Sequence, residues 1–102
     1  MKEYDLFLPL CYNDGEPVEP VKFRTVQRQL LDEFGAFTLF PQANEGVWRY
    51  GPVVYRDEIV IYRVVASQAR KARQFMRKLK QELLKAFRQE AIFIIERDVK
   101  VL

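Results

Sequence analysis

The sequence of 102 residues contains no histidine and a single cysteine, Cys11. Without histidine, the chain lacks the most common general base, the most common ligand of transition metals, and the usual partner of serine and cysteine nucleophiles. One cysteine excludes an internal disulfide and leaves no cysteine cluster for zinc or an iron–sulfur centre. These absences exclude most familiar hydrolases, and we expect no metal site and no cofactor.

Long apolar runs are also absent, since no stretch reaches the roughly 18 residues that a membrane-spanning helix needs. The first fifteen residues carry Asp5 and Pro9 within their only apolar stretch, which is unlike a secretory signal peptide. We therefore predict a cytoplasmic protein without a membrane partner. Hydrophobic residues make up 49% of the chain and charged residues 30%, a composition that predicts one globular domain over residues 1–102.

Positive charge is concentrated in one segment, although the net charge is only +3. Residues 67–90 hold eight lysines and arginines against two glutamates, whereas the rest of the chain holds nine cations against twelve acids. This distribution predicts a basic helix on a mildly acidic body. Such a helix is most often a solvated surface, but it could also meet an anionic partner such as nucleic acid or an acidic protein.

The spacing of hydrophobic residues predicts six elements. In chain order they are a strand over 4–10, a helix over 20–34, a strand over 36–40, a strand over 53–65, a helix that reaches about residue 87, and a strand over 91–96. A hairpin arm over 41–55 leads into the third strand, and Ser67 is expected to cap the second helix. Pro41 is expected to end the second strand, because proline cannot donate a ladder hydrogen bond.

This order of elements predicts an α+β fold, the ferredoxin-like βαββαβ sandwich. Its four-stranded antiparallel sheet has the order 4-1-3-2, and both helices cover one face. The strands over 53–65 and 91–96 carry large apolar side chains on both faces, so the face away from the helices needs a cover. We predict a homodimer packed through that open face, as in a dimeric α+β barrel. The alternative is that the arm around Trp48 folds across the face within one chain.

The loop after the first strand and the hairpin arm leave the predicted sheet at the same end, where polar and aromatic residues form a candidate ligand site. The candidate ligand-binding residues are Tyr12, Asn13, Trp48, Arg49, Tyr50 and Arg56. The two arginines could clamp a carboxylate or phosphate while an aromatic ring stacks on the ligand. The more ordinary interpretation is that Trp48 packs and that the arginines pair with nearby acids such as Asp57 and Glu58.

A second candidate site, for an anion, is the first turn of the basic helix. Arg70 and Lys71 lie there, although the helix dipole disfavours cations at this end unless an anion binds. Nucleic acid is not the partner that we expect. The first strand partly resembles the shorter motif of RNA-recognition domains, with Phe7 at the stacking position, but the longer motif is missing and residues 55–62 carry two acids instead.

The segment Gly46-Val47-Trp48-Arg49, then Gly51 and the run over 53–58, resembles an uncharacterised family of small bacterial proteins. The similarity covers roughly the middle third of the chain, together with the Gln89-Glu90 step before the last strand. This resemblance implies a ferredoxin-like fold; it implies no catalytic activity and nominates no site residue.

The function predicted from these features is that of a non-enzymatic cytoplasmic protein. It would form a homodimer through its open sheet face and bind a partner protein or a small anionic ligand. One alternative is a small enzyme of the dimeric α+β barrel kind that moves protons with tyrosine, arginine and carboxylates instead of histidine. Another is a weak nucleic-acid binder that uses the basic helix.

Overall fold

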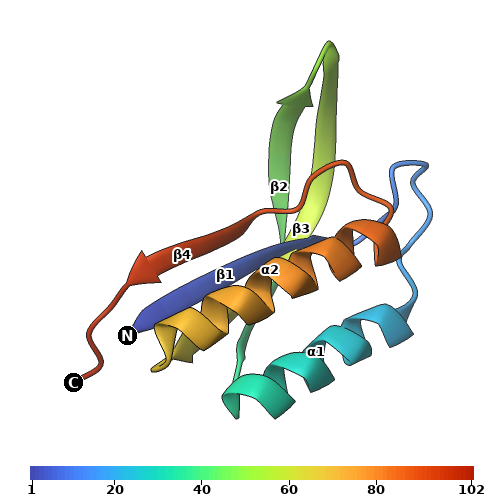
Figure 1. The fold of residues 1–102 in the computed structure, drawn as a ribbon. Coiled ribbons are helices and arrows are strands. Elements are labelled where there is room, and N and C mark those ends of the chain that lie inside the picture. The colour runs from blue at the N-terminus through green and yellow to red at the C-terminus, as the bar shows by residue number, and fades with distance from the viewer.

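The computed structural model describes all residues from Met1 to Leu102. The elements in chain order are β1 (Lys2–Pro9), α1 (Pro20–Phe34), β2 (Thr38–Tyr50), β3 (Val53–Ala66), α2 (Ala69–Ala86) and β4 (Ile94–Asp98). The strands form one antiparallel sheet in the order β2-β3-β1-β4, and both helices lie against the same face of it (Figure 1). The predicted ferredoxin-like fold and strand order are confirmed.

The helices begin and end much as their sequences predict. Pro20 stands at the first turn of α1, where its missing N–H costs nothing, and Gly35 ends the helix with a left-handed φ of 78°. In α2 the buried residues recur at helical spacing, but the residue before the helix is Gln68 rather than Ser67. The Gln68 carbonyl accepts the first helical hydrogen bond, from the N–H of Ala72, so the proposed capping role of Ser67 is wrong.

The hydrophobic core lies between the helices and one face of the sheet. Alternate residues of the two central strands point into it, including Leu6 and Leu8 of β1 and Tyr62 and Val64 of β3, all of them buried. The Tyr62 hydroxyl accepts a hydrogen bond of 2.9 Å from the Gln27 side chain of α1, which satisfies its polar end. Neither helix is both long and apolar enough to span a lipid bilayer.

Several strands differ from the sequence-based boundaries. The first strand, predicted over 4–10, is β1 at Lys2–Pro9. The predicted strand over 36–40 and the first half of the hairpin arm form one continuous strand, β2, because an irregularity between Phe40 and Asn44 accommodates Pro41 without ending the pairing with β3. The last strand begins at Ile94 rather than at residue 91. Ile92 is instead buried in the core, and pairing with β1 starts only where Ile94 lies opposite Leu6.

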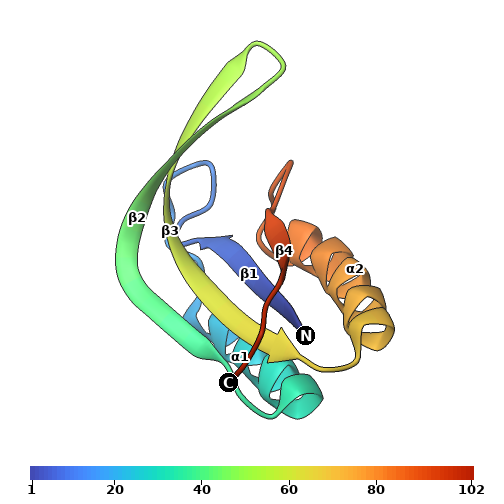
Figure 2. The same cartoon turned by 90° about the vertical axis from the view of Figure 1, so that its left-hand side faces the viewer.

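The outer parts of β2 and β3, residues 44–58, form an arm that projects beyond the rest of the molecule (Figures 1 and 2). Its tip turns at Gly51, whose φ of 61° is the left-handed conformation that glycine adopts without strain. The loop after β1 lies beside the base of this arm, and α2 begins at the opposite end of the sheet (Figure 1). The arm therefore extends away from the body and does not lie across the sheet.

Candidate functional site

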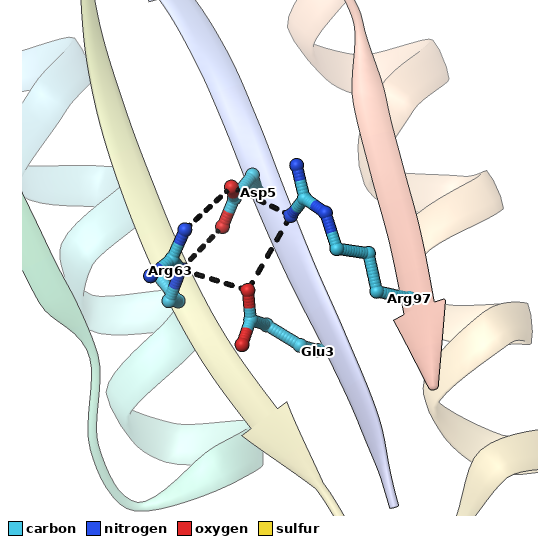
Figure 3. Close-up of polar contacts among 4 residues, drawn as sticks. All are labelled: Glu3, Asp5, Arg63 and Arg97. Carbon is cyan, nitrogen blue, oxygen red and sulfur yellow. Dashed lines mark hydrogen bonds and ion pairs between the residues drawn. The ribbon is translucent and has the colours of Figure 1, made fainter. Parts of the chain in front are cut away.

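The face of the sheet that points away from the helices, here called the open face, is divided into a charged part and an apolar part. The charged part contains Glu3, Asp5, Arg63 and Arg97, here called the charged quartet (Figure 3). The apolar part, here called the apolar patch, contains Phe7, Phe40, Ile59, Ile61, Phe93 and Ile95. Because paired residues of antiparallel strands share a face, the sheet register alone assigns most of these side chains to it.

Asp5 is the centre of the charged quartet. Its side chain is only 4% exposed, yet it accepts hydrogen bonds from Arg63 Nε at 2.8 Å and Nη2 at 3.0 Å, and from Arg97 Nη1 at 2.9 Å. Glu3 adds a second carboxylate, 3.0 Å from Arg63 Nε and 3.3 Å from Arg97 Nη1. The bonds from Arg63 outweigh the effect of burial and lower the pKa of Asp5, so this carboxylate stays ionised. Two cations thus balance two anions across three strands.

A second ion pair lies on the helix side of the sheet, at its β4 edge. Arg73 of α2 holds Glu96 of β4 with two hydrogen bonds of 3.0 Å, and the Tyr4 hydroxyl donates a third, of 2.6 Å. These bonds, with that of Arg73 contributing most, lower the pKa of Glu96 to about 2. Burial, followed by the bond to Glu96, raises the pKa of the Tyr4 phenol to about 12. The pair ties α2 to β4, and neither group is suited to exchange protons near neutral pH.

The apolar patch has no cover within the chain. Phe93 is 53% exposed and Ile95 36%, while the remaining members are half-buried. Contiguous apolar surface of this kind marks an interaction site in soluble proteins. On the arm, Val53 lies on the same side as Ile59 and is 47% exposed, whereas Val47 and Val54, also about half exposed, lie on the opposite side.

A groove with a cavity volume of about 230 Å³ opens where the arm leaves the apolar patch. Its walls come from three parts of the chain: β1, the arm, and the segment 89–93 before β4. Its lining includes the aromatic residues Phe7, Trp48 and Phe93, the aliphatic Ile59, and the polar residues Asp57 and Gln89. Aromatic walls with few polar groups are typical of small-molecule sites.

Trp48 organises this end of the molecule. Its indole stacks on Tyr55 of the facing strand, with ring centroids 4.5 Å apart and planes 17° apart, and its Nε1 donates a hydrogen bond of 2.8 Å to Asp57 Oδ2. Tyr50 lies edge-on to the same indole, at a centroid distance of 6.4 Å. These contacts fix the position of the Asp57 carboxylate in the groove wall.

Of the six predicted ligand-binding residues, only Trp48 lines the groove. Tyr12 is buried at the ends of the helices, where its hydroxyl donates to Glu19 and accepts from Lys22 and its ring lies under the cations of Lys22 and Arg88. Asn13 is exposed in the adjacent turn. The structure therefore does not bring the loop after β1 into contact with the aromatic residues of the arm.

The other predicted residues of the arm lie on two opposite sides of it. Tyr50 shares a side with Trp48, whereas Arg49 and Arg56 pair with Val54 and Val47 and point the other way. Arg56 forms its ion pair with Glu45, at 3.3 Å, and not with the acids that follow it in sequence. One chain alone thus does not assemble the proposed arginine clamp and aromatic wall, and a ligand role for these residues stays a prediction.

The predicted anion-binding pair lies at the start of α2, at the far end of the sheet. Lys71 lines a shallow cavity of about 170 Å³ with Ser67 and Gln68, and its Nζ is 3.9 Å from a carboxylate oxygen of Glu33. Arg70 is exposed and does not line this cavity. Anion binding by this pair also stays a prediction.

The sequence contained a partial signal for one of the residues that were missed. Asp57 is two residues before Ile59, so strand alternation places both on the same face, but this strand is apolar on both faces and only the structure shows which of them is open. Gln89 gives no such signal, because it lies in an irregular segment whose path depends on the burial of Phe87 and Ile92. The contacts of Asp5 could not be predicted from the sequence, because they depend on which residues of β3 and β4 lie beside it in the sheet.

Known proteins share the fold of this chain but not its sequence. Neither a protein-family model nor a curated protein sequence matches it. Among solved structures, it is similar to a phage SAM lyase in complex with S-methyl-5'-thioadenosine, with a TM-score of 0.66 and 13% identity over 95% of this chain and 80% of the lyase.

Two further solved structures have the same architecture. The divalent cation tolerance protein CutA1 of Thermus thermophilus gives a TM-score of 0.61 and 16% identity over 97% of this chain and 84% of that one. The PII-like protein CutA of Nostoc sp. gives 0.55 and 18% over 97% and 81%. This agrees with a small protein of ferredoxin-like fold; membership of a particular family stays a prediction.

Proposed function

We propose that this chain is a non-enzymatic protein that forms a homodimer through its open face and binds a small ligand or a partner protein at the groove. The observation that carries the proposal is the exposed apolar patch, above all Phe93 and Ile95. Two copies related by a two-fold axis would bury the same patch on each other, which is the commonest arrangement of soluble oligomers. The charged quartet contains both signs of charge, so the same surface is able to complement itself.

The arm gives a second reason to expect self-association. A two-stranded ribbon is at best marginally stable in water by itself, and on the side of the open face the arm exposes Tyr50 and Val53. Packing against a second copy would remove these side chains from water, and burial of apolar surface stabilises an interface by roughly 25 cal/mol for each Å². We therefore expect the arm to take part in the dimer contact along with the apolar patch.

A binding role is favoured over catalysis by the state of the carboxylates. Asp5 and Glu96 are each held by arginine, and this lowers the pKa of both groups, so they are weak bases. The names of the similar structures do not decide the matter, because one is a lyase and another a divalent cation tolerance protein, and one fold supports many functions.

The test is the mass of the native particle, measured by analytical ultracentrifugation over a range of concentrations. We expect twice the mass of the 12.2 kDa chain for the unaltered protein and the single-chain mass for Phe93→Glu. Leu31→Glu on α1 is the matched control, because Leu31 is 51% exposed and Phe93 is 53% exposed. A dimer that survives Phe93→Glu would contradict the proposed interface, and an unaltered protein that stays monomeric would contradict self-association altogether.

A further inference from the structure

The groove at the base of the arm contains one formal charge, and it is negative. Among its lining residues, Asp57 is the single ionisable side chain, and no lysine or arginine takes part. The arginines of the arm do not contribute, because strand alternation places Arg49 and Arg56 on the opposite side. An anionic ligand would therefore meet a carboxylate and no compensating cation.

Asp57 also retains capacity to bind. It accepts one hydrogen bond, from Trp48 Nε1 to its Oδ2, and it takes part in no ion pair. Asp57 is half-buried and, unlike Asp5, forms no hydrogen bond or ion pair with an arginine, since Arg56 pairs with Glu45. A carboxylate accepts at about four lone-pair positions, so further donors can be bound without breaking the contact to Trp48.

The rest of the groove suits an apolar body with an aromatic ring. Phe7, Trp48 and Phe93 supply three ring systems, and Ile59 supplies an aliphatic surface. Aromatic faces attract cations as well as stack with rings, so they complement the charge of Asp57. A cavity of about 150 Å³ holds a benzene molecule, and the 230 Å³ of this groove therefore leaves room for roughly nine non-hydrogen atoms.

We propose that the groove binds a small organic cation, an ammonium group on an aromatic or other apolar body, with the ammonium at Asp57 and the body between Phe7 and Phe93. This inference rests on the binding part of the proposed function and specifies its ligand. It also replaces the anionic ligand expected from the sequence with a cationic one. The groove shares Phe7 and Phe93 with the apolar patch, so the ligand and the second copy would contact the same two rings, but each proposal has its own test.

The experiment uses three probes of one shape and different charge: 2-phenylethylamine, which is cationic, 2-phenylethanol, which is neutral, and phenylacetate, which is anionic. Trp48 is the only tryptophan, so its fluorescence and its indole N–H resonance report on the groove alone. We expect the amine to bind with a millimolar Kd, about what a ligand of this size reaches. It should bind up to about fivefold more tightly than the alcohol, the upper end of the gain from one partly exposed ion pair, and phenylacetate should bind more weakly than both.

Two matched variants show whether the preference comes from Asp57. Asp57→Asn keeps an oxygen to accept the bond from Trp48 and removes the charge, so the amine should bind only as tightly as the alcohol. Glu58→Gln removes the same charge from the opposite side of the arm and should leave the preference for the amine unchanged.

Equal binding of all three probes, or a preference for phenylacetate, would refute the cationic ligand. An amine preference that persists in Asp57→Asn would refute the role of that carboxylate. No response from any probe would refute the groove as a small-molecule site. The sedimentation result would stand in each case, so failure of this inference is distinguishable from failure of the proposed dimer.

Discussion

Replacing Asp5 with asparagine should destabilise the fold far more than its size suggests. The side chain is 4% exposed and accepts three hydrogen bonds from two guanidinium groups. Hydrogen bonds to charged groups contribute roughly 1.5–3 kcal/mol each. The contributions of the three hydrogen bonds cannot simply be added. Arg63 and Arg97 are 38% and 46% exposed, so water hydrates them when the Asp5 carboxylate is removed, and both keep Glu3 as a partner. Since asparagine also turns an N–H toward a cation, we expect a net loss of about 2–3 kcal/mol.

For a domain of this length the loss corresponds to a Tm lower by about 10–20 °C, measurable by circular dichroism at neutral pH. The control is Asp98→Asn, which removes a carboxylate that is 85% exposed and paired with Lys2, and which should change the Tm far less. An Asp5→Asn variant whose Tm falls no further than that of Asp98→Asn would refute the idea that the charged quartet holds the sheet together.

The pH dependence gives an independent check on the same residue. The pKa of Asp5 is lowered in the folded state from its ordinary value of 3.8, so the unfolded chain takes up the proton first as the pH falls. The stabilisation is therefore present above pH 3.8 and is lost as the pH falls through the folded pKa. The difference in stability between the unaltered protein and Asp5→Asn should stay constant near neutrality and shrink in acid. A difference that grows on acidification would mean that the sign of this argument is wrong.

Three further changes test other parts of the structure. Arg73→Gln should raise the pKa of Glu96 from about 2 toward 4.5 in an NMR titration, because Arg73 provides the largest lowering effect; an unchanged pKa would exclude that cause. Gly51→Ala should cost about 1 kcal/mol in urea unfolding, because alanine is strained at a φ of 61°, and an unchanged midpoint would mean that the turn relaxes. Tyr12→Phe should lower the Tm, because the hydroxyl loses both its bond to Glu19 and the bond from Lys22, with no effect on probe binding at the groove; altered probe binding would place Tyr12 in that site after all.

The fold was predictable because its main signals are local. The alternation of Leu6 and Leu8 with other residues in β1, and the spacing of Met76, Leu79 and Leu83 in α2, are properties of short segments. Once the order of elements is known, chain-connection rules leave few sheet topologies. The error at Pro41 shows the limit of this approach. Proline excludes a regular ladder hydrogen bond, but an irregularity of the strand removes the need for one.

The candidate site was less predictable because it depends on register. That Trp48 lies opposite Tyr55, and that Arg56 lies opposite Val47, follows from where the turn at Gly51 falls. Moving the register by one residue would exchange the two sides of the arm.

The charged quartet is harder still to foresee. Asp5 meets Arg63 and Arg97 from 58 and 92 residues away, and no local pattern contains that information.

The irregularity between Phe40 and Asn44 has a consequence for how the molecule avoids aggregation. β2 is an outer strand of thirteen residues, long enough to recruit strands of other molecules into a continuous sheet, whereas the opposite edge, β4, has only five. Pro41 and the bulged residues interrupt the row of free N–H and C=O groups near the middle of β2. This irregularity thus divides a long outer edge into two short ones, which disfavours edge-to-edge pairing of β2 with strands of other molecules.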